Sequence, residues 1–164
     1  MSKKALYAGS FDPITRGHLD IIQRGARLFD QVYVAVASNT SKQAFFSPEE
    51  KVALVEEVTA DLANVQVLQF TEGLTVDLAR DVGASVLLRG IRNNTDFEYE
   101  MNMAEINKLQ APDIETVILL SDAAYRAYSS SMIKEVASFG GEVEAAVPKV
   151  VAQAMFAKYK DLNA

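Results

Sequence analysis

Short apolar segments with the character of β-strands alternate with helical patterns along the whole chain. Residues 5–8 form an apolar segment that ends at a glycine, residues 31–37 are rich in β-branched side chains, and residues 64–70 alternate apolar and polar positions. Residues 84–88 and 115–120 are nearly continuous apolar runs, which are typical of strands covered on both faces. The pattern therefore predicts five strands.

Helical patterns fill the intervals between these strands. The clearest helix start is Ser47-Pro48-Glu49-Glu50, which places serine at the N-cap, proline at the first helical position and glutamate at the third, as in a capping box. Further helices are predicted over residues 15–29, 74–81, 96–109, 130–139 and 148–159.

The alternation of strands and helices constrains the fold strongly. Consecutive strands separated by helices pair in parallel through right-handed crossovers, which gives an open sheet with helices on both faces. We therefore expect a single domain over residues 1–164 with a doubly wound, Rossmann-like α/β fold and a five-stranded parallel sheet. In such folds ligands bind beyond the carboxyl ends of the strands, so the loops after the strands are where chemistry should be sought.

Composition narrows the classes of function. With 164 residues, of which 49% are apolar, the chain suffices for one core, and it has no apolar run of the roughly 18 residues that a membrane span needs. It begins without a secretory signal pattern, so a cytoplasmic location is expected. Because there are no cysteines, disulfides, thiolate nucleophiles and cysteine zinc sites are excluded. The net charge of −6 opposes binding along a nucleic acid backbone.

The loop after the first strand, Gly9 to His18, carries the strongest chemical signal. It lacks the glycine patterns of dinucleotide-binding folds and of P-loops, but it places the chain's only histidine at the start of a helix, in the segment Thr15-x-Gly17-His18. A helix start offers unpaired N–H groups to an anion, and an imidazole there adds a movable donor. A lone histidine is nevertheless more often a capping or packing residue, so this alternative stays open.

Several other loops carry groups suited to phosphate. Arg89 and Arg92 flank Gly90 directly after the fourth predicted strand, which places two guanidinium groups around a flexible residue at the ligand edge of the sheet. Lys42 lies in the polar loop of residues 38–43, and Ser129-Ser130-Ser131 reads as an N-cap with exposed N–H groups and hydroxyls. The alternatives are solvated surface cations for the first three and simple capping for the serines.

These segments resemble known proteins. Thr15-x-Gly17-His18 resembles the T/H-x-G-H signature of the adenylyl and cytidylyl transferase superfamily, which is related to the class I aminoacyl-tRNA synthetases. Four longer segments, residues 7–15, 89–92, 95–100 and 129–131, resemble the bacterial phosphopantetheine adenylyltransferase family. The likeness runs from about residue 4 to residue 158 and covers essentially the whole predicted domain.

The resemblance implies an enzyme that transfers the adenylyl group of ATP to 4'-phosphopantetheine, giving dephospho-coenzyme A and pyrophosphate. It implies that His18 is the catalytic residue, which bonds the α-phosphate in the transition state. The residues it implies for the acceptor substrate are Ser10, Lys42, Thr75 and Arg89. Those it implies for ATP are Ser10, Phe11, His18, Gly90, Ile91, Arg92, Glu100, Tyr125, Arg126, Ala127, Tyr128, Ser129, Ser130 and Ser131. On physical grounds alone, Glu100 would be read as a complement to a helix dipole.

The resemblance also implies Mg²⁺ with ATP, no metal ligands among the site residues and a homohexamer. Exposed apolar positions near Met101, Met103 and Ile106 are candidates for an interface between subunits, although core packing is the commoner role of such residues. Ala8 and Tyr128 depart from the usual residues of the family. Two alternatives stay open: a sibling transferase for nicotinamide mononucleotide or a glycerol phosphate, and a nucleotide sensor without catalysis.

Overall fold

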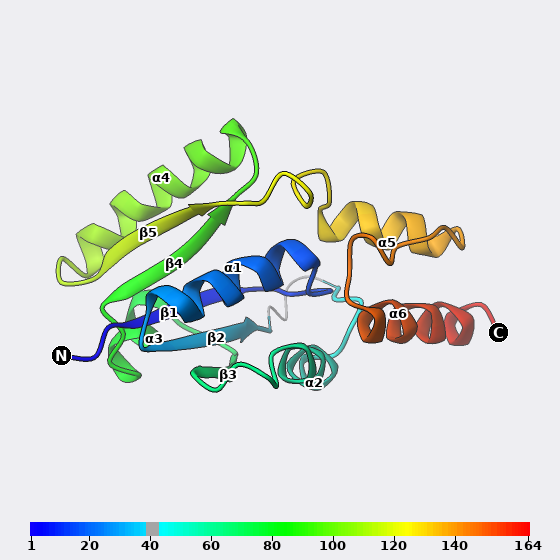
Figure 1. Ribbon diagram of the computed structural model, residues 1–164, viewed down its shortest axis with the longest axis horizontal. Helices are drawn as coiled ribbons and strands as arrows, with labels where there is room; N and C mark the ends of the chain where they lie inside the picture. Colours follow the sequence, from blue (N-terminus) through cyan, green and yellow to red (C-terminus); the bar gives the residue numbers. More distant parts are fainter. Residues whose placement is uncertain (39–42) are drawn as a thin grey trace.

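A computed structural model describes residues 1–38 and 43–164 of the protein (Figure 1). Its centre is a five-stranded sheet in the order β3-β2-β1-β4-β5. Every neighbouring pair of strands is parallel. The strands are β1 (Lys4–Gly9), β2 (Gln31–Ala37), β3 (Val65–Phe70), β4 (Val86–Ile91) and β5 (Glu115–Leu120). The five predicted strands and the predicted parallel, doubly wound fold are therefore confirmed.

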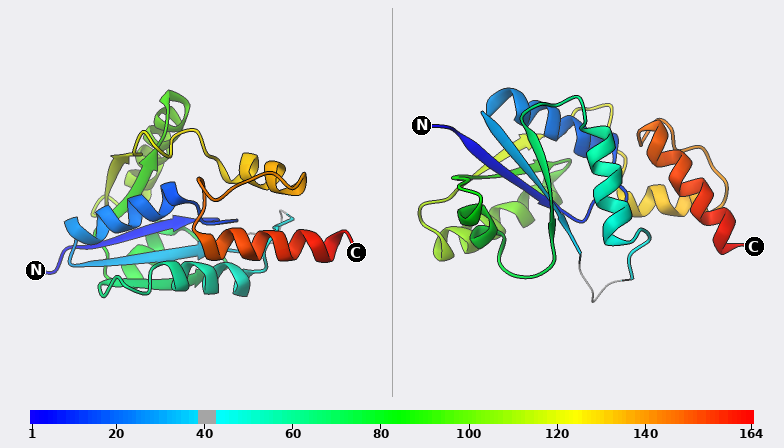
Figure 2. Two further views of the ribbon diagram at one scale, coloured as in Figure 1. Left: turned by 45° about the vertical axis from the view of Figure 1, so that its right-hand side comes forward. Right: turned by 90° about the horizontal axis from the view of Figure 1, so that it is seen from below.

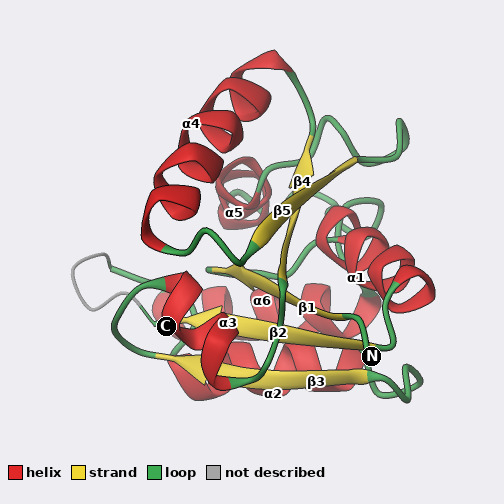
Figure 3. Cartoon of the chain, turned by 90° about the vertical axis from the view of Figure 1, so that its left-hand side faces the viewer, coloured by secondary structure: helices red, strands yellow, loops and turns green. Residues whose placement is uncertain are grey.

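Helices cover both faces of the sheet. They are α1 (Arg16–Leu28), α2 (Pro48–Val58), α3 (Thr75–Asp81), α4 (Asn94–Gln110), α5 (Ser130–Ser138) and α6 (Lys149–Leu162). Figure 3 shows α1 and α4 on opposite sides of β4 and β5. The last two helices, α5 and α6, extend beyond the strands toward the C-terminus (Figures 1 and 2). Each predicted helix is present, with ends within two or three residues of those expected, as is usual for helix boundaries.

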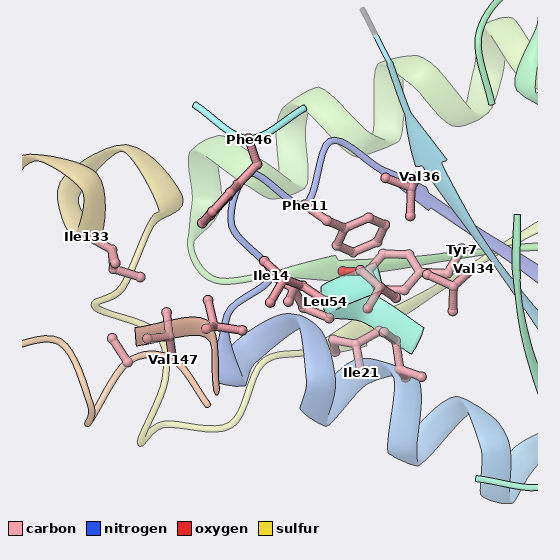
Figure 4. Close-up of a cluster of buried hydrophobic side chains, with 14 of the residues drawn as sticks. Tyr7, Phe11, Ile14, Ile21, Val34, Val36, Phe46, Leu54, Ile133 and Val147 are labelled. Atoms are coloured by element: carbon pink, nitrogen blue, oxygen red, sulfur yellow. The ribbon is translucent and has the colours of Figure 1, made fainter. Parts of the chain in front are cut away.

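Two groups of buried side chains fill the space between sheet and helices. The larger one joins β1, β2 and β4 to α1 and α2 and continues to α5 and α6, with Ile21, Val34, Leu54 and Ile133 among its members (Figure 4). The smaller group packs α3 and the turn after α4, with Ala111 and Ile114, against the other face. Because helices cover both faces, a central strand such as β4 can be apolar on both sides, which is the pattern read from residues 84–88.

The helix start at Ser47 has the predicted capping box. The backbone N–H of Glu50 donates to the Ser47 hydroxyl at 3.1 Å, and the Ser47 N–H donates to the Glu50 carboxylate at 2.7 Å. Both bonds satisfy N–H groups that the helix itself leaves free. This local feature follows from four consecutive residues, so the sequence is sufficient to predict it.

The fourth strand differs from its prediction. It runs from Val86 to Ile91, so Arg89 and Gly90 lie within the strand, not in a flexible loop after it. Parallel pairing with β5 continues through the register Arg89 to Ile118 and on to the end of both strands, which holds this segment extended. A Cβ on Gly90 would lie 2.9 Å from Ile21 Cγ1, so this glycine allows α1 to approach the sheet closely. Gly90 therefore permits close packing, whereas the sequence suggested that it is a flexible residue between two arginines.

The strand order reverses at β1, which pairs with β2 on one side and with β4 on the other. The chain leaves β1 toward α1 on one face, while it leaves β4 toward α4 on the opposite face. A crevice opens at such a point in doubly wound sheets, and ligands bind there. No helix in residues 1–38 or 43–164 is long and apolar enough to cross a membrane.

Candidate active site

Three pockets meet at Ser10, directly after β1. The first, here called the polar pocket, has a volume of about 320 Å³ and is lined by His18, Arg92, Tyr125 and Ser130, among others. Ser10 lines this pocket and also the two described next. The loop after the first strand, which the sequence analysis singled out, therefore lies where three pockets meet.

The other two pockets differ in character. The apolar pocket, about 230 Å³, is lined by Ala37, Phe70, Thr75, Met103 and further residues. The lysine pocket, about 270 Å³, contains two lysines and borders His18; its lining includes Asp12, Gln43, Ala44, Lys51, Ser131 and Lys134. A ligand with a polar and an apolar half can thus lie across Ser10 with its reacting group beside His18.

The His18 ring is held by the start of its own helix. His18 is the third residue of α1, where Thr15 is the N-cap, and its N–H donates to the Thr15 hydroxyl at 3.1 Å. In return the Thr15 N–H donates to His18 Nδ1 at 3.1 Å. Because Nδ1 accepts, the hydrogen-bond network assigns the proton of the neutral ring to Nε2. Capping and a chemical role are therefore compatible, and the ring is fixed rather than movable.

The surroundings keep this imidazole neutral. Burial is the largest cause, and the positive charges of Arg92 and Arg89 add to it, so that the pKa of His18 falls from 6.5 to about 4. At pH 7 the ring consequently presents an Nε2–H donor without carrying a charge of its own. Such a group can bond a phosphate oxygen, but it is not placed to act as a base through Nδ1.

Phe11 supports the ring from the side. Its φ of 47° lies in the left-handed region, which is uncommon for a bulky residue and costs on the order of 1–3 kcal/mol. The Phe11 side chain is buried and meets the His18 ring edge to face, with centroids 5.1 Å apart. Tyr7 packs on the other edge of Phe11 at 5.4 Å. The strained residue thus places an aromatic wall against the histidine.

Arg89 is fixed by a two-point ion pair. Its Nε and Nη2 donate to the two Glu100 carboxylate oxygens at 2.8 and 2.7 Å, and Nη1 donates to the Ala8 carbonyl. Burial acts to lower the pKa of Arg89, but the hydrogen bonds and charge of Glu100 outweigh it and raise the pKa. Glu100 is buried and lines both the polar and the apolar pocket. Glu100 is therefore more than a complement to the helix dipole, because it orients Arg89 where the polar and apolar pockets meet.

Arg92 is oriented in a similar way from the start of α4. Its Nε donates to Asp96 Oδ2 at 3.1 Å, and its backbone N–H donates to the same oxygen at 3.0 Å. Asn93 caps the helix by accepting from the Asp96 N–H at 2.9 Å. Arg92 and Gly90 line the polar pocket, whereas Ile91, also implied for ATP, does not appear in its lining.

The N-terminus of α5 faces the histidine loop. Ser129 is the N-cap and its hydroxyl accepts from the Met132 N–H at 3.2 Å, as the sequence predicted. Ser130 donates its hydroxyl to the Pro13 carbonyl at 3.0 Å, which ties α5 to the loop that carries His18. Tyr125 and Tyr128 line the polar pocket with these two serines.

Some residues implied for the site lie elsewhere. Ser131 lines the lysine pocket instead of the polar one. Arg126 donates from Nε to the Ser121 carbonyl at 3.1 Å, and neither it nor Ala127 is part of the lining of the three pockets. Lys42, which the resemblance assigned to the acceptor, falls outside the described residues. Thr75 lines the apolar pocket, in agreement with its expected position.

Sequence reasoning missed several residues that the fold brings to the site. Tyr99 and Asn107 line the apolar pocket from α4, and so does Met103, which was considered for a subunit interface or for core packing. Lys134 reaches Asp12 at 3.3 Å in the lysine pocket. The available signal was the position of Lys134 four residues after Ser130, on the same side of α5 as the second of the three serines.

A doubly wound sheet with a neutral histidine at the start of its first helix defines a class of nucleotide-binding fold. Residues 6–136 match the model of the cytidylyltransferase-like family. A solved structure from Vibrio parahaemolyticus, a candidate nicotinate-nucleotide adenylyltransferase, has the same fold, with a TM-score of 0.73, 16% identity and coverage of 98% of this chain and 97% of that one. The class is therefore that of the nucleotidyltransferases.

Sequence relatives define the class more narrowly. The phosphopantetheine adenylyltransferase of Lacticaseibacillus paracasei is 52% identical, over 99% of this chain and 98% of that protein. The protein of the same name from Synechococcus elongatus is 54% identical, over 94% and 93%. The chain belongs to the phosphopantetheine adenylyltransferase family.

Proposed function

We propose that this protein transfers the adenylyl group of ATP to 4'-phosphopantetheine. An oxygen of the acceptor's 4'-phosphate attacks the α-phosphorus of ATP and forms a new P–O bond. The bond from the α-phosphorus to the oxygen bridging to the β-phosphorus breaks, and its electrons leave with pyrophosphate. The products are dephospho-coenzyme A and pyrophosphate.

One observation carries this proposal. In a chain about half identical to phosphopantetheine adenylyltransferases over nearly its full length, an apolar and a polar pocket meet at Ser10 beside His18. An adenylyl transfer to an acceptor with a long neutral arm needs two such pockets in contact at one reacting centre. The roles of the individual residues below are part of the proposal.

Each pocket suits one part of the two substrates. The polar pocket, with Tyr125 and Tyr128 as flat apolar walls, suits the adenosine and α-phosphate. The apolar pocket suits the pantetheine arm, and its position beside Arg89 would direct the phosphate of that arm to the junction. The lysine pocket, with Lys134 and the start of α5, suits the β- and γ-phosphates.

Catalysis in this scheme depends on position and charge. The attacking phosphate is already ionised at neutral pH, so no general base is required. His18 would donate its Nε2–H to an oxygen of the α-phosphate, where negative charge grows as the new bond forms. Because the ring is neutral and held by Thr15 and Phe11, the donor is aimed before the substrates arrive.

Mg²⁺ is expected to enter with ATP. The carboxylates that line the polar pocket, Asp96 and Glu100, are paired with Arg92 and Arg89. Across residues 1–38 and 43–164, no three His, Asp or Glu side chains are grouped so that they could hold a metal ion. Because Asp96 and Glu100 are already paired with arginines, we infer that the ion is held mainly by phosphate oxygens and water and neutralises charge on the phosphates.

A homo-oligomer is also part of this proposal. The outer side of α4 exposes Met101, Ile106 and Leu109, of which Leu109 is 79% exposed. Core packing, the alternative considered for these positions, does not apply to Met101 and Ile106. A second copy of the chain would remove these side chains from water, and six copies are the number that the resemblance implies.

The reaction is tested by pyrophosphate release from ATP and Mg²⁺ with different acceptors. We expect turnover with 4'-phosphopantetheine and far less with nicotinamide mononucleotide or glycerol phosphate. A preference for either of the latter would make the protein a sibling transferase. ATP binding without turnover on the three acceptors would make it a sensor.

The role of His18 is tested in the same assay. We expect His18→Ala to lower kcat by roughly 10²-fold or more, as removal of a single transition-state donor does in other enzymes. His18→Gln keeps a side chain that can accept at the capping position, so it serves as a control for helix stability. Unchanged turnover in the alanine variant would remove His18 from the mechanism.

A further inference from the structure

Described residues on either side of positions 39–42 line two pockets. Ala37, at the end of β2, lines the apolar pocket. Gln43 and Ala44, shortly before α2, line the lysine pocket. In the proposed function these walls face the acceptor and the leaving phosphates, so their placement relative to His18 determines how the two substrates meet.

Lys51 holds the wall at the end of β2. Its side chain is 2% exposed, and it is the largest of the fully buried side chains. Lys51 is the fourth residue of α2, and its Nζ donates to the Ala37 carbonyl at 2.6 Å. Burial of an ammonium group is unfavourable, and an apolar side chain of the same length would fill the space. The hydrogen bond to the strand end therefore gives a reason for a lysine here.

Asp12 holds the wall before α2 from the histidine loop. Its Oδ2 accepts from the Phe45 N–H and its Oδ1 from the Phe46 N–H, both at 2.9 Å. Lys134 of α5 donates to Oδ2 at 3.3 Å. The Asp12 residue is 6% exposed, so one buried carboxylate joins the loop of His18, the segment before α2 and α5.

The two residues act on each other as well. The negative charge of Asp12 raises the pKa of Lys51, while burial and the charge of Lys134 lower it, and the net direction is downward. Asp12 thus sits near two lysines that line one pocket, and it offsets part of their mutual repulsion. Neither Asp12 nor Lys51 was assigned a role from the sequence or from the resemblance.

We propose that Asp12 and Lys51 are a positioning pair that holds two walls of the site at a set distance from His18: the acceptor-side wall at Ala37 and the phosphate-side wall next to Phe45 and Phe46. The inference rests on the proposed function. Lys51 fixes the strand end at Ala37, and Asp12 fixes the chain at Phe45 and Phe46. Lys51 acts through the Ala37 carbonyl, which belongs to the apolar pocket, so its loss should displace the acceptor more than the nucleotide.

Lys51→Met tests the pair, because methionine keeps much of the apolar stem and removes the ammonium. We expect the KM for 4'-phosphopantetheine to rise and kcat to fall, so that kcat/KM is about 10-fold lower than in the wild-type protein. The reason is that small displacements of a bound reactant reduce rates strongly. The Kd for ATP, measured without acceptor by calorimetry, should stay within about 3-fold of wild type.

Lys51→Arg retains a cationic donor and should restore most of kcat/KM. Asp12→Asn, which presents an amide donor to the Phe45 N–H, should shift the same parameters.

Leu54→Ala is the matched control for a loss of stability. Leu54 lies on α2, is buried, and has no polar group. It should lower Tm as much as Lys51→Met does, or more, with little change in the KM for the acceptor. Equal changes in KM for both variants would overturn the proposal, as would unchanged kinetics in Lys51→Met.

A weakening of ATP or pyrophosphate binding that exceeds the effect on the acceptor would make Lys51 a direct phosphate ligand and would also overturn the proposal. Failure of the proposed function is distinguishable from these outcomes. In that case the wild-type protein itself would show no turnover with 4'-phosphopantetheine. With wild-type turnover present, the variants test the positioning pair alone.

Discussion

At the scale of single residues, the protonation state of His18 separates the proposed chemistry from an ordinary capping role. The imidazole accepts from the Thr15 N–H, and burial together with Arg92 and Arg89 lowers its pKa to about 4. A residue that only caps the helix needs the hydrogen bond from Thr15 but does not need a lowered pKa. The neutral ring with its proton on Nε2 is therefore the feature most worth measuring.

Because His18 is the chain's only histidine, one ring signal in the NMR spectrum of untagged protein reports on it. We expect a midpoint near pH 4 and the Nε2–H tautomer at pH 7, whereas the urea-unfolded chain should titrate near pH 6.5. The folded state then binds fewer protons than the unfolded state between these values. The stability that this difference contributes is present above pH 6.5 and is lost as the pH falls toward 4. A folded-state midpoint near 6.5 would contradict the proposed environment.

At the scale of elements, the close approach of α1 to β4 sets where the histidine lies. Gly90 in the strand faces Ile21 in the helix, and a Cβ on Gly90 would lie 2.9 Å from Ile21 Cγ1. Cγ1 is not the free end of the side chain, so either the Ile21 rotamer changes within a packed core or α1 shifts to admit a methyl group. A shift of α1 also moves the start of the helix, where His18 lies.

We expect Gly90→Ala to lower the free energy of unfolding by about 1–3 kcal/mol, as overpacking commonly does, and to lower kcat. Ile21→Ala makes room for the new methyl group, so the double variant should be more stable than the sum of the two single effects allows. Urea unfolding of the four proteins measures this coupling. Gly17→Ala is the control for stability, since its Cβ would meet Tyr125 and Thr15 at an ordinary 3.5 Å. Additive effects of Gly90→Ala and Ile21→Ala would show that the contact does not position α1.

At the scale of the whole molecule, the surface of α4 is the main feature that a single chain leaves unexplained. Its inner side builds the apolar pocket with Tyr99, Met103 and Asn107, while its outer side exposes Met101, Ile106 and Leu109. One helix thus joins the apolar pocket to the proposed contact between copies.

We expect light scattering after gel filtration to give the mass of a homo-oligomer for the wild-type protein. Two lysines in the double variant Ile106→Lys, Leu109→Lys would place charges in the contact and lower the mass, because desolvating unpaired charges is unfavourable. Leu162→Lys, at an exposed position near the C-terminus, is the control and should leave the mass unchanged. A monomeric wild-type protein would contradict the oligomer and the role given to α4.

Much of the fold was predictable because its signals are local. The apolar runs of residues 31–37 and 115–120 match β2 and β5 at both ends, and the capping box at Ser47 needs only four neighbouring residues. The position of His18 at the start of a helix was predictable for the same reason, since Thr15 and His18 lie on one helix turn. The parallel pairing of the strands followed from the alternation of strands and helices, and no long-range contact had to be known.

The remaining features depend on residues that are distant in the sequence. The end of β4 is decided by its pairing with β5, and the role of Gly90 by Ile21, which lies 69 positions earlier on another element. Patterns of neighbouring residues do not indicate such long-range contacts. For this reason the sequence suggested a flexible loop where the structure has a rigid strand.

The sequence by itself determined the doubly wound order, the helix starts and the histidine at the first of them, because each is specified by neighbouring residues. Only the tertiary structure decided that Arg89 is held by Glu100, that Asp12 bonds the Phe46 N–H and Lys51 the Ala37 carbonyl, and that His18 is neutral. Burial and the charges that meet in space set these properties, and both arise when the elements pack together.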